Sequence, residues 1–175
     1  MTLKPTPLKS LGAAPSDPTA QQDVLWMEHA LVLAEKAQAQ GDVPVGCVLV
    51  SAQGVVGEGF NARERALDPT AHAELLAIRA AAAALNRWRL ADCTLYVTLE
   101  PCFMCAGAIV LARIPRVVFA ATDPKAGASG SLANVLQDAR LNHRCAVTSG
   151  VLQQEASAQL KNFFAERRKK KEIST

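Results

Sequence analysis

The sequence lacks a long apolar run: no segment of its 175 residues approaches the ~18 consecutive apolar residues that cross a bilayer. The first residues, MTLKPTPLKSLGAAPSDPTA, also lack the compact apolar region of a secretory signal and contain no arginine, which transit peptides usually carry. We therefore expect a cytoplasmic protein with no membrane partner. In that reducing compartment the five cysteines are not expected to form a disulfide framework, so a close cysteine pair suggests metal binding or catalysis.

No internal repeat divides the chain. At 50% hydrophobic residues, a chain of this length buries one core, which predicts a single domain. Residues 1–22 are rich in Pro, Ser, Thr and Ala, and we expect a disordered arm there. The domain itself is expected over residues 23–170, with a short tail at 171–175.

Apolar periodicity predicts helices and strands that alternate along the chain. The first helix is expected to begin at Asp23 as N-cap and to stop at Gly41. The predicted helices are 23–40, 72–86, 101–112 and 151–170, and the predicted strands are 45–50, 55–60, 94–99, 116–121 and 145–150. The first two strands form a hairpin, so at least part of the sheet is antiparallel. This pattern predicts an α/β fold, a three-layer α/β/α sandwich with a mixed five-stranded sheet.

The segment TLEPCFMCAGA (Thr98 to Ala108) carries a cysteine pair where a strand passes into a helix. Pro101 suits the first helical turn, which places Cys102 and Cys105 near unpaired N–H groups and the positive end of the helix dipole. That environment favours the thiolate, the form that binds metal. The pair alone could also be a redox couple, half of a structural zinc site, or two small core residues.

A second helix start supplies the partners for this cysteine pair. The segment TAHAE offers His72 and Glu74, and a metal beyond the end of the helix could be reached by both side chains. His72, Cys102 and Cys105 then make three zinc ligands and leave a fourth position for a solvent molecule. Glu74 would lie beside that water as a general base and then a general acid.

The alternatives need other residues to take part. A structural zinc site would need a fourth ligand, and a redox pair is disfavoured by the nearby H-x-E triplet. The remaining cysteines look like buried strand residues, and the other two histidines are expected to be structural; these are Cys47, Cys93, Cys145, His29 and His143.

Positive charge is concentrated at the C-terminal end. Residues 161–175 (KNFFAERRKKKEIST) hold six basic and two acidic side chains, whereas the other 160 residues carry a net charge of −1. Such a cluster beside two phenylalanines is compatible with nucleic-acid binding. Taken alone, it is more typical of a solvated helix end, where positive charge also suits the helix dipole.

H-x-E followed by P-C-x-x-C is the zinc deaminase signature. In order and spacing, further segments resemble the bacterial tRNA-specific adenosine deaminases, within the cytidine/deoxycytidylate deaminase superfamily: DVPVGCVLV, GEGFN, DPTAHAE, TLYVTLEPCFMCAGA, RVVFAATD and GASGSL. The triplet NHR and the basic, Phe-containing final helix continue the resemblance. It spans residues 24–170 and implies a cytidine deaminase-like fold.

The resemblance implies an activity and a cofactor. One Zn²⁺ per subunit on His72, Cys102 and Cys105 would activate a water that attacks C6 of a flipped-out adenine. Glu74 would carry the proton first to N1 and then to the departing ammonia. The product would be inosine, at the wobble adenosine of an arginine tRNA anticodon.

The resemblance also implies substrate contacts and a homodimer. Asn61 would contact the nucleotide, the backbone around Ala73 and Leu99 would hold the base edge, and Asp123 would bind a neighbouring ribose. Further RNA contacts are expected from the C-terminal helix through Phe163, Phe164, Arg167, Arg168 and Lys169.

The loop at Asp123 departs from the family. Thr122 stands where many relatives have arginine, and Pro124 and Ala126 are further substitutions, so substrate context is less fixed than chemistry. Two other functions remain open: a small-substrate deaminase acting on guanine or a cytosine nucleotide, and a noncatalytic zinc-stabilised RNA-binding protein.

Overall fold

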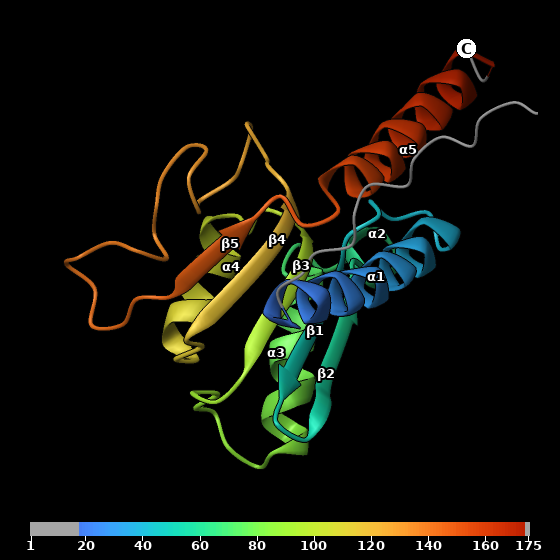
Figure 1. The fold of residues 1–175 in the computed structure, drawn as a ribbon. Coiled ribbons are helices and arrows are strands. Elements are labelled where there is room, and N and C mark those ends of the chain that lie inside the picture. Colours follow the sequence, from blue (N-terminus) through green and yellow to red (C-terminus); the bar gives the residue numbers. More distant parts are fainter. Residues whose placement is uncertain (1–17, 174–175) are drawn as a thin grey trace, which may run out of the picture.

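A five-stranded mixed sheet forms the centre of the fold, which is known from a computed structural model describing residues 18–173 (Figure 1). The strand order is β2-β1-β3-β4-β5. β1 pairs antiparallel with β2 and β3, whereas β3, β4 and β5 run parallel. The strands are β1 (Gly46–Ser51), β2 (Gly54–Phe60), β3 (Thr94–Leu99), β4 (Arg116–Ala121) and β5 (Ala146–Ser149).

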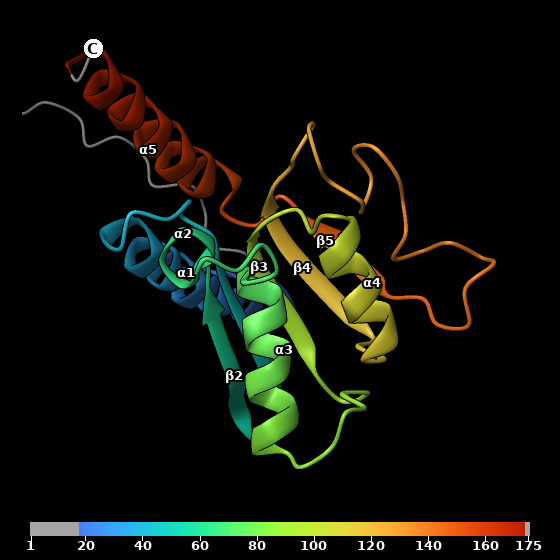
Figure 2. The same ribbon diagram turned by 180° about the vertical axis from the view of Figure 1, so that it is seen from behind.

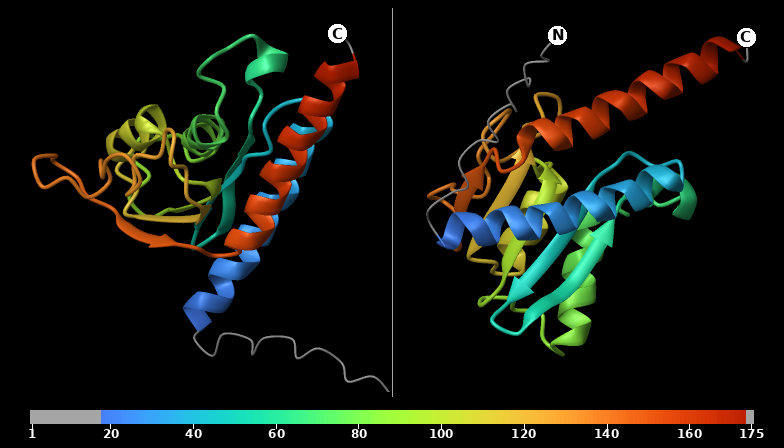
Figure 3. Two further views of the ribbon diagram at one scale, coloured as in Figure 1. Left: turned by 90° about the horizontal axis from the view of Figure 1, so that it is seen from above. Right: turned by 45° about the vertical axis from the view of Figure 1, so that its right-hand side comes forward.

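Helices cover both faces of this sheet. They are α1 (Pro18–Ala39), α2 (Arg63–Ala66), α3 (Ala73–Ala84), α4 (Phe103–Leu111) and α5 (Gln153–Ile173). α1 and α5 lie on the face toward the viewer in Figure 1, and α3 and α4 lie on the other face, seen in Figure 2. Figure 3 shows the sheet between these two helical layers. The predicted three-layer α/β/α sandwich is confirmed.

Strand alternation builds a separate core on each face of the sheet, because successive side chains point to opposite sides. Leu95 and Val97 pack toward α3 and α4, whereas Tyr96 between them packs toward α1. Val117 and Val118 of β4 divide in the same way. Burial on both faces explains why these strands read as continuous apolar runs.

The first and last helices extend beyond their predicted bounds. α1 begins at Pro18, so residues 18–22 are helical and not part of a disordered arm; the rest of the predicted arm lies outside the described residues. Asp23 is not an N-cap, because its carboxylate accepts hydrogen bonds from Arg116 (2.7 Å) and from the Tyr96 hydroxyl (3.1 Å). α5 continues to Ile173, into the predicted tail.

Two local predictions also differ from the structure. The polar segment expected as a loop contains the one-turn helix α2. α4 begins at Phe103 with Cys102 as N-cap, so Pro101 lies just before the helix rather than in its first turn. Within residues 18–173, no helix combines the length and apolarity that crossing a membrane requires.

Candidate active site

The site lies where α3 and α4 begin, on the same face and at the same end of the sheet. His72 is the N-cap of α3 and Cys102 is the N-cap of α4, both with extended backbone. Neither side chain caps its own helix. Instead, the Nδ1 atom of His72 lies 3.7 Å from Sγ of Cys102 and 3.5 Å from Sγ of Cys105.

These three residues are placed to hold a metal ion. Their ligand atoms all lie within 4.8 Å of one another, and no other such group occurs among the described residues. Zinc with sulfur and nitrogen ligands at ~2.3 and ~2.0 Å in a tetrahedron separates those ligand atoms by roughly 3.5 Å. The observed separations therefore fit zinc without rearrangement, and three ligands leave a tetrahedral position open.

The pKa values of the two thiols are shifted in opposite directions. A hydrogen bond from Cys105, together with His72, outweighs burial and lowers the pKa of the Cys102 thiol to about 3. The same hydrogen bond to Cys102, with burial and Glu74, raises the pKa of Cys105 far above its usual range. The hydrogen bond to Cys102 also raises the pKa of His72. One thiolate is thus already present before a metal binds, and a metal cation would favour ionisation of the second.

Glu74 lies in the first turn of α3, two residues beyond the His72 ligand. Its side chain is buried, with the residue 4% exposed. Burial raises the pKa of its carboxyl to about 7, although its own backbone N–H and His72 act in the opposite direction. A carboxyl with a pKa near neutrality can both accept and return a proton, which is the property required of a general base that later acts as an acid.

A cavity of about 670 Å³ opens in front of this cluster. Its walls come from the residues just before β1, from the segment between β2 and α3 together with the start of α3, from the end of β3 and the start of α4, from the loop after β4, and from α5. Of the predicted site residues, the cavity walls include Asn61, His72, Glu74, Leu99, Cys102, Asp123 and Phe164. The structure therefore brings together residues from positions 61 to 164 of the chain around one space.

Asn61 has a structural partner as well as a place on the cavity wall. Its Oδ1 accepts a hydrogen bond of 3.0 Å from the backbone N–H of Ala73, and the residue is 6% exposed. The NH2 group of the Asn61 amide takes no part in this hydrogen bond. Ala73, the first residue of α3, is fully buried and is not among the cavity residues. Its N–H donates to Asn61 and does not face the cavity.

The Asp123 loop is held by a compact set of hydrogen bonds. Asp123 Oδ1 accepts the N–H groups of Lys125 (2.9 Å) and Ala126 (3.2 Å), and its carbonyl accepts the N–H of Gly127. Pro124 lies inside this turn at a position where no donor is needed, so its lack of an N–H is tolerated. Pro124 and Ala126 are thus compatible with Asp123 facing the cavity.

The predicted contacts on α5 need one correction. Phe163 is 5% exposed and packs edge-on against Phe164, so it is not available for stacking on RNA. Phe164 is 44% exposed and lines the cavity. Arg167 lies over the Phe163 ring and 3.9 Å from Glu64 of α2, and it is not among the cavity residues.

Two basic residues that the sequence analysis missed, Lys125 and Lys161, also face this space, next to the predicted Arg168. Lys125 and Lys161 line the cavity, and Arg168 joins them in an adjoining recess beside Phe164. Positions 161, 164 and 168 follow the spacing of one helix face, and this spacing is a signal in the sequence that could have identified the group.

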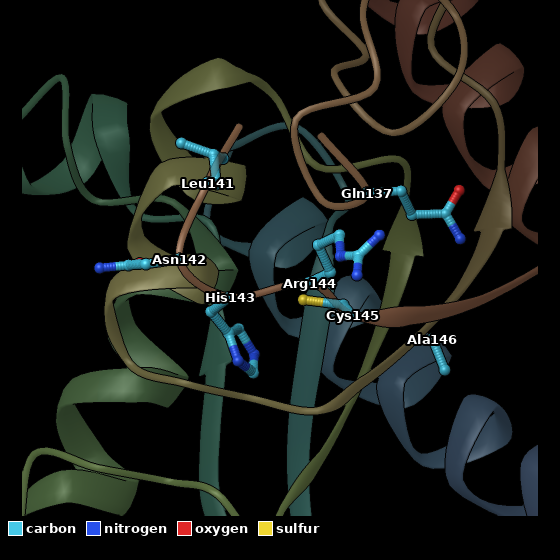
Figure 4. Close-up of a pocket in the computed structure, with 7 residues that line it drawn as sticks. All are labelled: Gln137, Leu141, Asn142, His143, Arg144, Cys145 and Ala146. Carbon is cyan, nitrogen blue, oxygen red and sulfur yellow. The ribbon is translucent and has the colours of Figure 1, made fainter. Parts of the chain in front are cut away.

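The other histidines and cysteines are not part of the metal-ligand cluster. His29 contacts Glu58 at 2.6 Å, and Nε2 of His143 lies 2.8 Å from the carbonyl oxygen of Ile114. Cys47, Cys93 and Cys145 are buried free thiols. Figure 4 shows the hollow beside His143, also of about 670 Å³, whose lining comes entirely from residues 137–146 and includes none of the predicted site residues.

Residues 20–121 match the model of the cytidine and deoxycytidylate deaminase zinc-binding region. The chain belongs to this deaminase family. The match contains the His72, Glu74, Cys102 and Cys105 cluster, so the family assignment and the geometry agree on the same part of the chain.

Relatives within this deaminase family act on more than one kind of substrate. The tRNA-specific adenosine deaminase of Bacillus subtilis (strain 168) is 52% identical over 87% of this chain and 95% of its own length. A solved structure from studies of A-to-I editing by tRNA:A34 deaminases is 43% identical, with a TM-score of 0.75 over 78% of this chain and 99% of that one. A guanine deaminase from Bacillus subtilis is 41% identical over 56% of this chain and 63% of its own, with a TM-score of 0.54.

Proposed function

We propose that this protein is a zinc-dependent tRNA adenosine deaminase that converts the wobble adenosine of an arginine tRNA to inosine, with one zinc ion per subunit. The observation that carries the proposal is the His72, Cys102 and Cys105 cluster beside buried Glu74, at the base of a cavity bordered by Asp123 and by basic residues of α5. Similarity to tRNA-specific adenosine deaminases along nearly all of their length supports the choice of substrate.

The chemistry follows from the positions of the side chains. Zinc bound by His72, Cys102 and Cys105 would lower the pKa of a water molecule toward 7 and so supply a nucleophile at neutral pH. Glu74 accepts a proton from the attacking water as oxygen bonds to C6 of adenine, and delivers it to N1. The proton of the new C6 hydroxyl then passes through Glu74 to the C6 amino group, which leaves as ammonia as the C6 carbonyl of inosine forms.

Recognition is assigned to the cavity wall. Asn61 and the backbone near Leu99 would hold the base, with Ala73 acting indirectly through its hydrogen bond to Asn61. Asp123 would bind a ribose next to the target adenosine, which distinguishes RNA from DNA. The half-exposed ring of Phe164 offers a stacking surface at the mouth of the cavity.

Charge at the cavity mouth favours a polyanionic substrate over a free base. Lys125, Lys161 and Arg168 line a recess together with Phe164. Lys125, Lys161 and Phe164 also line the cavity, so the recess and the cavity share these walls. Phosphates on either side of a flipped-out nucleotide would meet these cations. A guanine deaminase has no need for such a surface, although the likeness to one makes a small-substrate deaminase the second candidate.

A homodimer is proposed from the exposed face of α4. This helix has no polar side chain, and Phe103, Met104 and Leu111 are 54%, 36% and 70% exposed. Apolar residues gathered on one face of a helix mark an interaction site more often than a solvated surface. Because Cys102 is the N-cap of α4 and Cys105 lies in its first turn, a partner subunit on this face would lie next to the site. The reaction itself would take place in the cytoplasm, where tRNA is.

The test is inosine formation by the purified protein on an arginine tRNA anticodon stem-loop with adenosine at the wobble position. Free adenosine, guanine and a cytidine nucleotide run in parallel, and Glu74→Gln serves as the control. We expect inosine only at the wobble position, and no turnover by the zinc-loaded variant. Turnover confined to guanine or a cytosine nucleotide would establish the small-substrate alternative. Zinc binding and RNA binding without turnover would establish a binding protein.

A further inference from the structure

Glu100 is a buried carboxylate for which the proposed reaction has no use. It stands between β3 and the Pro101–Cys102 start of α4, and the residue is 2% exposed. Burying a carboxylate is costly unless hydrogen bonds satisfy it. Its position in the chain, between a strand and a metal ligand, raises the question of what keeps the charge there.

The partners of Glu100 all come from one segment, the loop after β4. Oε1 accepts the N–H groups of Ser129 (3.0 Å) and Ser131 (3.0 Å). Oε2 accepts the N–H of Asp123 (2.9 Å) and the hydroxyl of Ser131. These four donors are uncharged and are spread over nine residues of the loop, so one side chain ties both ends of the loop to a single point.

The loop is shaped to receive this carboxylate. A Cβ atom at Gly127 would lie 2.4 Å from the Glu100 carboxyl carbon and 2.4 Å from its Oε2. The backbone adds further ties, because the N–H of Ala128 donates to the carbonyl of Pro101 (2.8 Å) and the N–H of Glu100 donates to the carbonyl of Ala121 (2.8 Å). The loop therefore wraps around Glu100 and is attached to the same short segment that carries Cys102.

The consequence concerns the cavity wall. Asp123 and Lys125 belong to this loop and face the cavity, whereas the metal ligands and Glu74 belong to α3 and α4. The Glu100 carboxylate is the side chain that joins the first group to the second, in addition to these backbone hydrogen bonds. A loop released from Glu100 would leave the zinc site intact but would no longer hold Asp123 at a fixed distance from the reacting base.

We propose that Glu100 is a positioning residue for RNA recognition: its carboxylate orders residues 123–131 into the wall that grips the nucleotides around the target adenosine. This inference rests on the proposed tRNA function for its effect on turnover. The ordering of the loop itself does not depend on the substrate.

Glu100→Gln is the direct test. In either orientation of the Gln amide, its NH2 group replaces an oxygen that accepts a backbone N–H, so at least one of the four hydrogen bonds is lost with little change of shape. We expect zinc content equal to wild type, faster amide exchange over residues 123–131, and a KM for the anticodon stem-loop raised about tenfold, as expected for lost hydrogen bonds to a charged group. The kcat should change by no more than about twofold, because saturating RNA restores the loop.

Ser131→Ala and Ser129→Ala form a matched pair. Ser131→Ala removes one hydrogen-bond donor to Glu100. It should raise KM and speed amide exchange in the loop, both by less than Glu100→Gln does. The Ser129 hydroxyl is buried without a hydrogen-bond partner among the described residues, so Ser129→Ala should leave both unchanged. If Glu100→Gln does not fold, Ser131→Ala carries the test alone.

Several outcomes separate this inference from the proposed function. Unchanged loop exchange and KM in Glu100→Gln and Ser131→Ala would overturn the positioning role. Loss of zinc, or a fall in kcat at full zinc, would place Glu100 in the metal site or the chemistry and also overturn it. If the wild type fails to deaminate the stem-loop, the proposed function falls, and amide exchange in the two variants still tests the ordering of the loop.

Discussion

At the scale of single residues, Cys102 and His72 show how a helix start becomes a metal site. N-cap side chains ordinarily accept hydrogen bonds from their own helix. Here both turn to each other, across 3.7 Å, and leave their helices uncapped. The stability lost by the missing caps would be regained when a metal binds all three ligands.

Cys102→Ser should lose zinc. A hydroxyl does not ionise near neutral pH, so the thiolate that the site stabilises has no replacement. We expect zinc per chain, measured by atomic spectroscopy after dialysis, to fall at least tenfold and deamination to fall with it. Cys145→Ser is the matched control, because its Sγ donates to the carbonyl of Ile114 (3.1 Å) and a hydroxyl can do the same. Full zinc occupancy in Cys102→Ser would refute the ligand assignment.

Glu74 should make the zinc-free protein less stable as pH rises. Burial raises the pKa of this carboxyl from 4.5 to about 7, so its contribution to stability is fully present below pH 4.5 and is lost as pH rises through 7. Glu74→Gln has no carboxyl to ionise, so it removes this loss of stability at high pH. We expect urea unfolding of the chelator-treated proteins to show the variant more stable at pH 8, by about 3 kcal/mol.

At pH 4.5 the same two proteins should unfold at nearly the same urea concentration. A stability difference that stays constant between pH 4.5 and 8 would contradict the raised pKa. The comparison measures the loss of unfolding free energy caused by ionising Glu74 separately from deamination, since the variant is expected to be inactive at every pH.

At the scale of elements, the contact of β2 with α3 positions His72 and Glu74. Gly57 and Gly59 face α3, whose inner surface is made of alanines, so that the strand and the helix pack backbone to backbone. A Cβ atom at Gly59 would lie 2.2 Å from the carbonyl oxygen of Ala73 and 2.7 Å from the nitrogen of Ala77. Close packing against β2 thus explains the alanines at positions 73, 77 and 81 of α3.

Gly59→Ala should push α3 away from the sheet at the turn that carries Glu74. We expect a loss of about 2–3 kcal/mol in unfolding free energy, typical of overpacking, together with lower zinc affinity. Glu58→Ala is the control on the same strand, because Glu58 faces solvent and loses only the exposed contact with His29. Such exposed pairs are worth under about 1 kcal/mol. Equal effects of the two substitutions would argue against the close approach.

At the scale of the whole molecule, the two faces of the sheet have different surroundings. α5 extends past the sheet edge and carries basic residues beside the cavity, as Figure 1 shows for the helix, whereas α4 on the other face exposes apolar side chains. The first surface suits a polyanion and the second suits another copy of the chain.

Leu111→Glu should therefore yield a monomer. Placing a charge at the most exposed apolar position of α4 would cost far more in a buried interface than in solvent. We expect light scattering coupled to gel filtration to give a dimer mass for the wild type and a monomer mass for the variant. Leu25→Glu is the control, since Leu25 is 54% exposed on α1, across the sheet. A monomeric wild type, or a dimeric Leu111→Glu, would refute the proposed interface.

The amino-acid sequence by itself determined the elements and the chemistry of the ligands. The strands at 94–99 and 116–121 were predicted to the residue, because continuous apolar runs between breakers are local signals. His72, Glu74, Cys102 and Cys105 could be chosen because their spacing at helix starts is also local. The predictions failed at chain ends, where Asp23 was assigned to a cap and not to its ion pair with Arg116.

Only the tertiary structure decided which of these residues share one space. Phe163 and Phe164 are neighbours in sequence, yet one is buried and the other lines the cavity, because the contact of α5 with the sheet fixes the rotation of the helix. Lys125, Lys161 and Arg168 meet only through that packing. The grip of Glu100 on a loop more than 20 residues away in sequence likewise depends on β3 and β4 lying side by side in parallel. Pairings over such separations are set by the packing of whole elements, which no local pattern in the chain encodes.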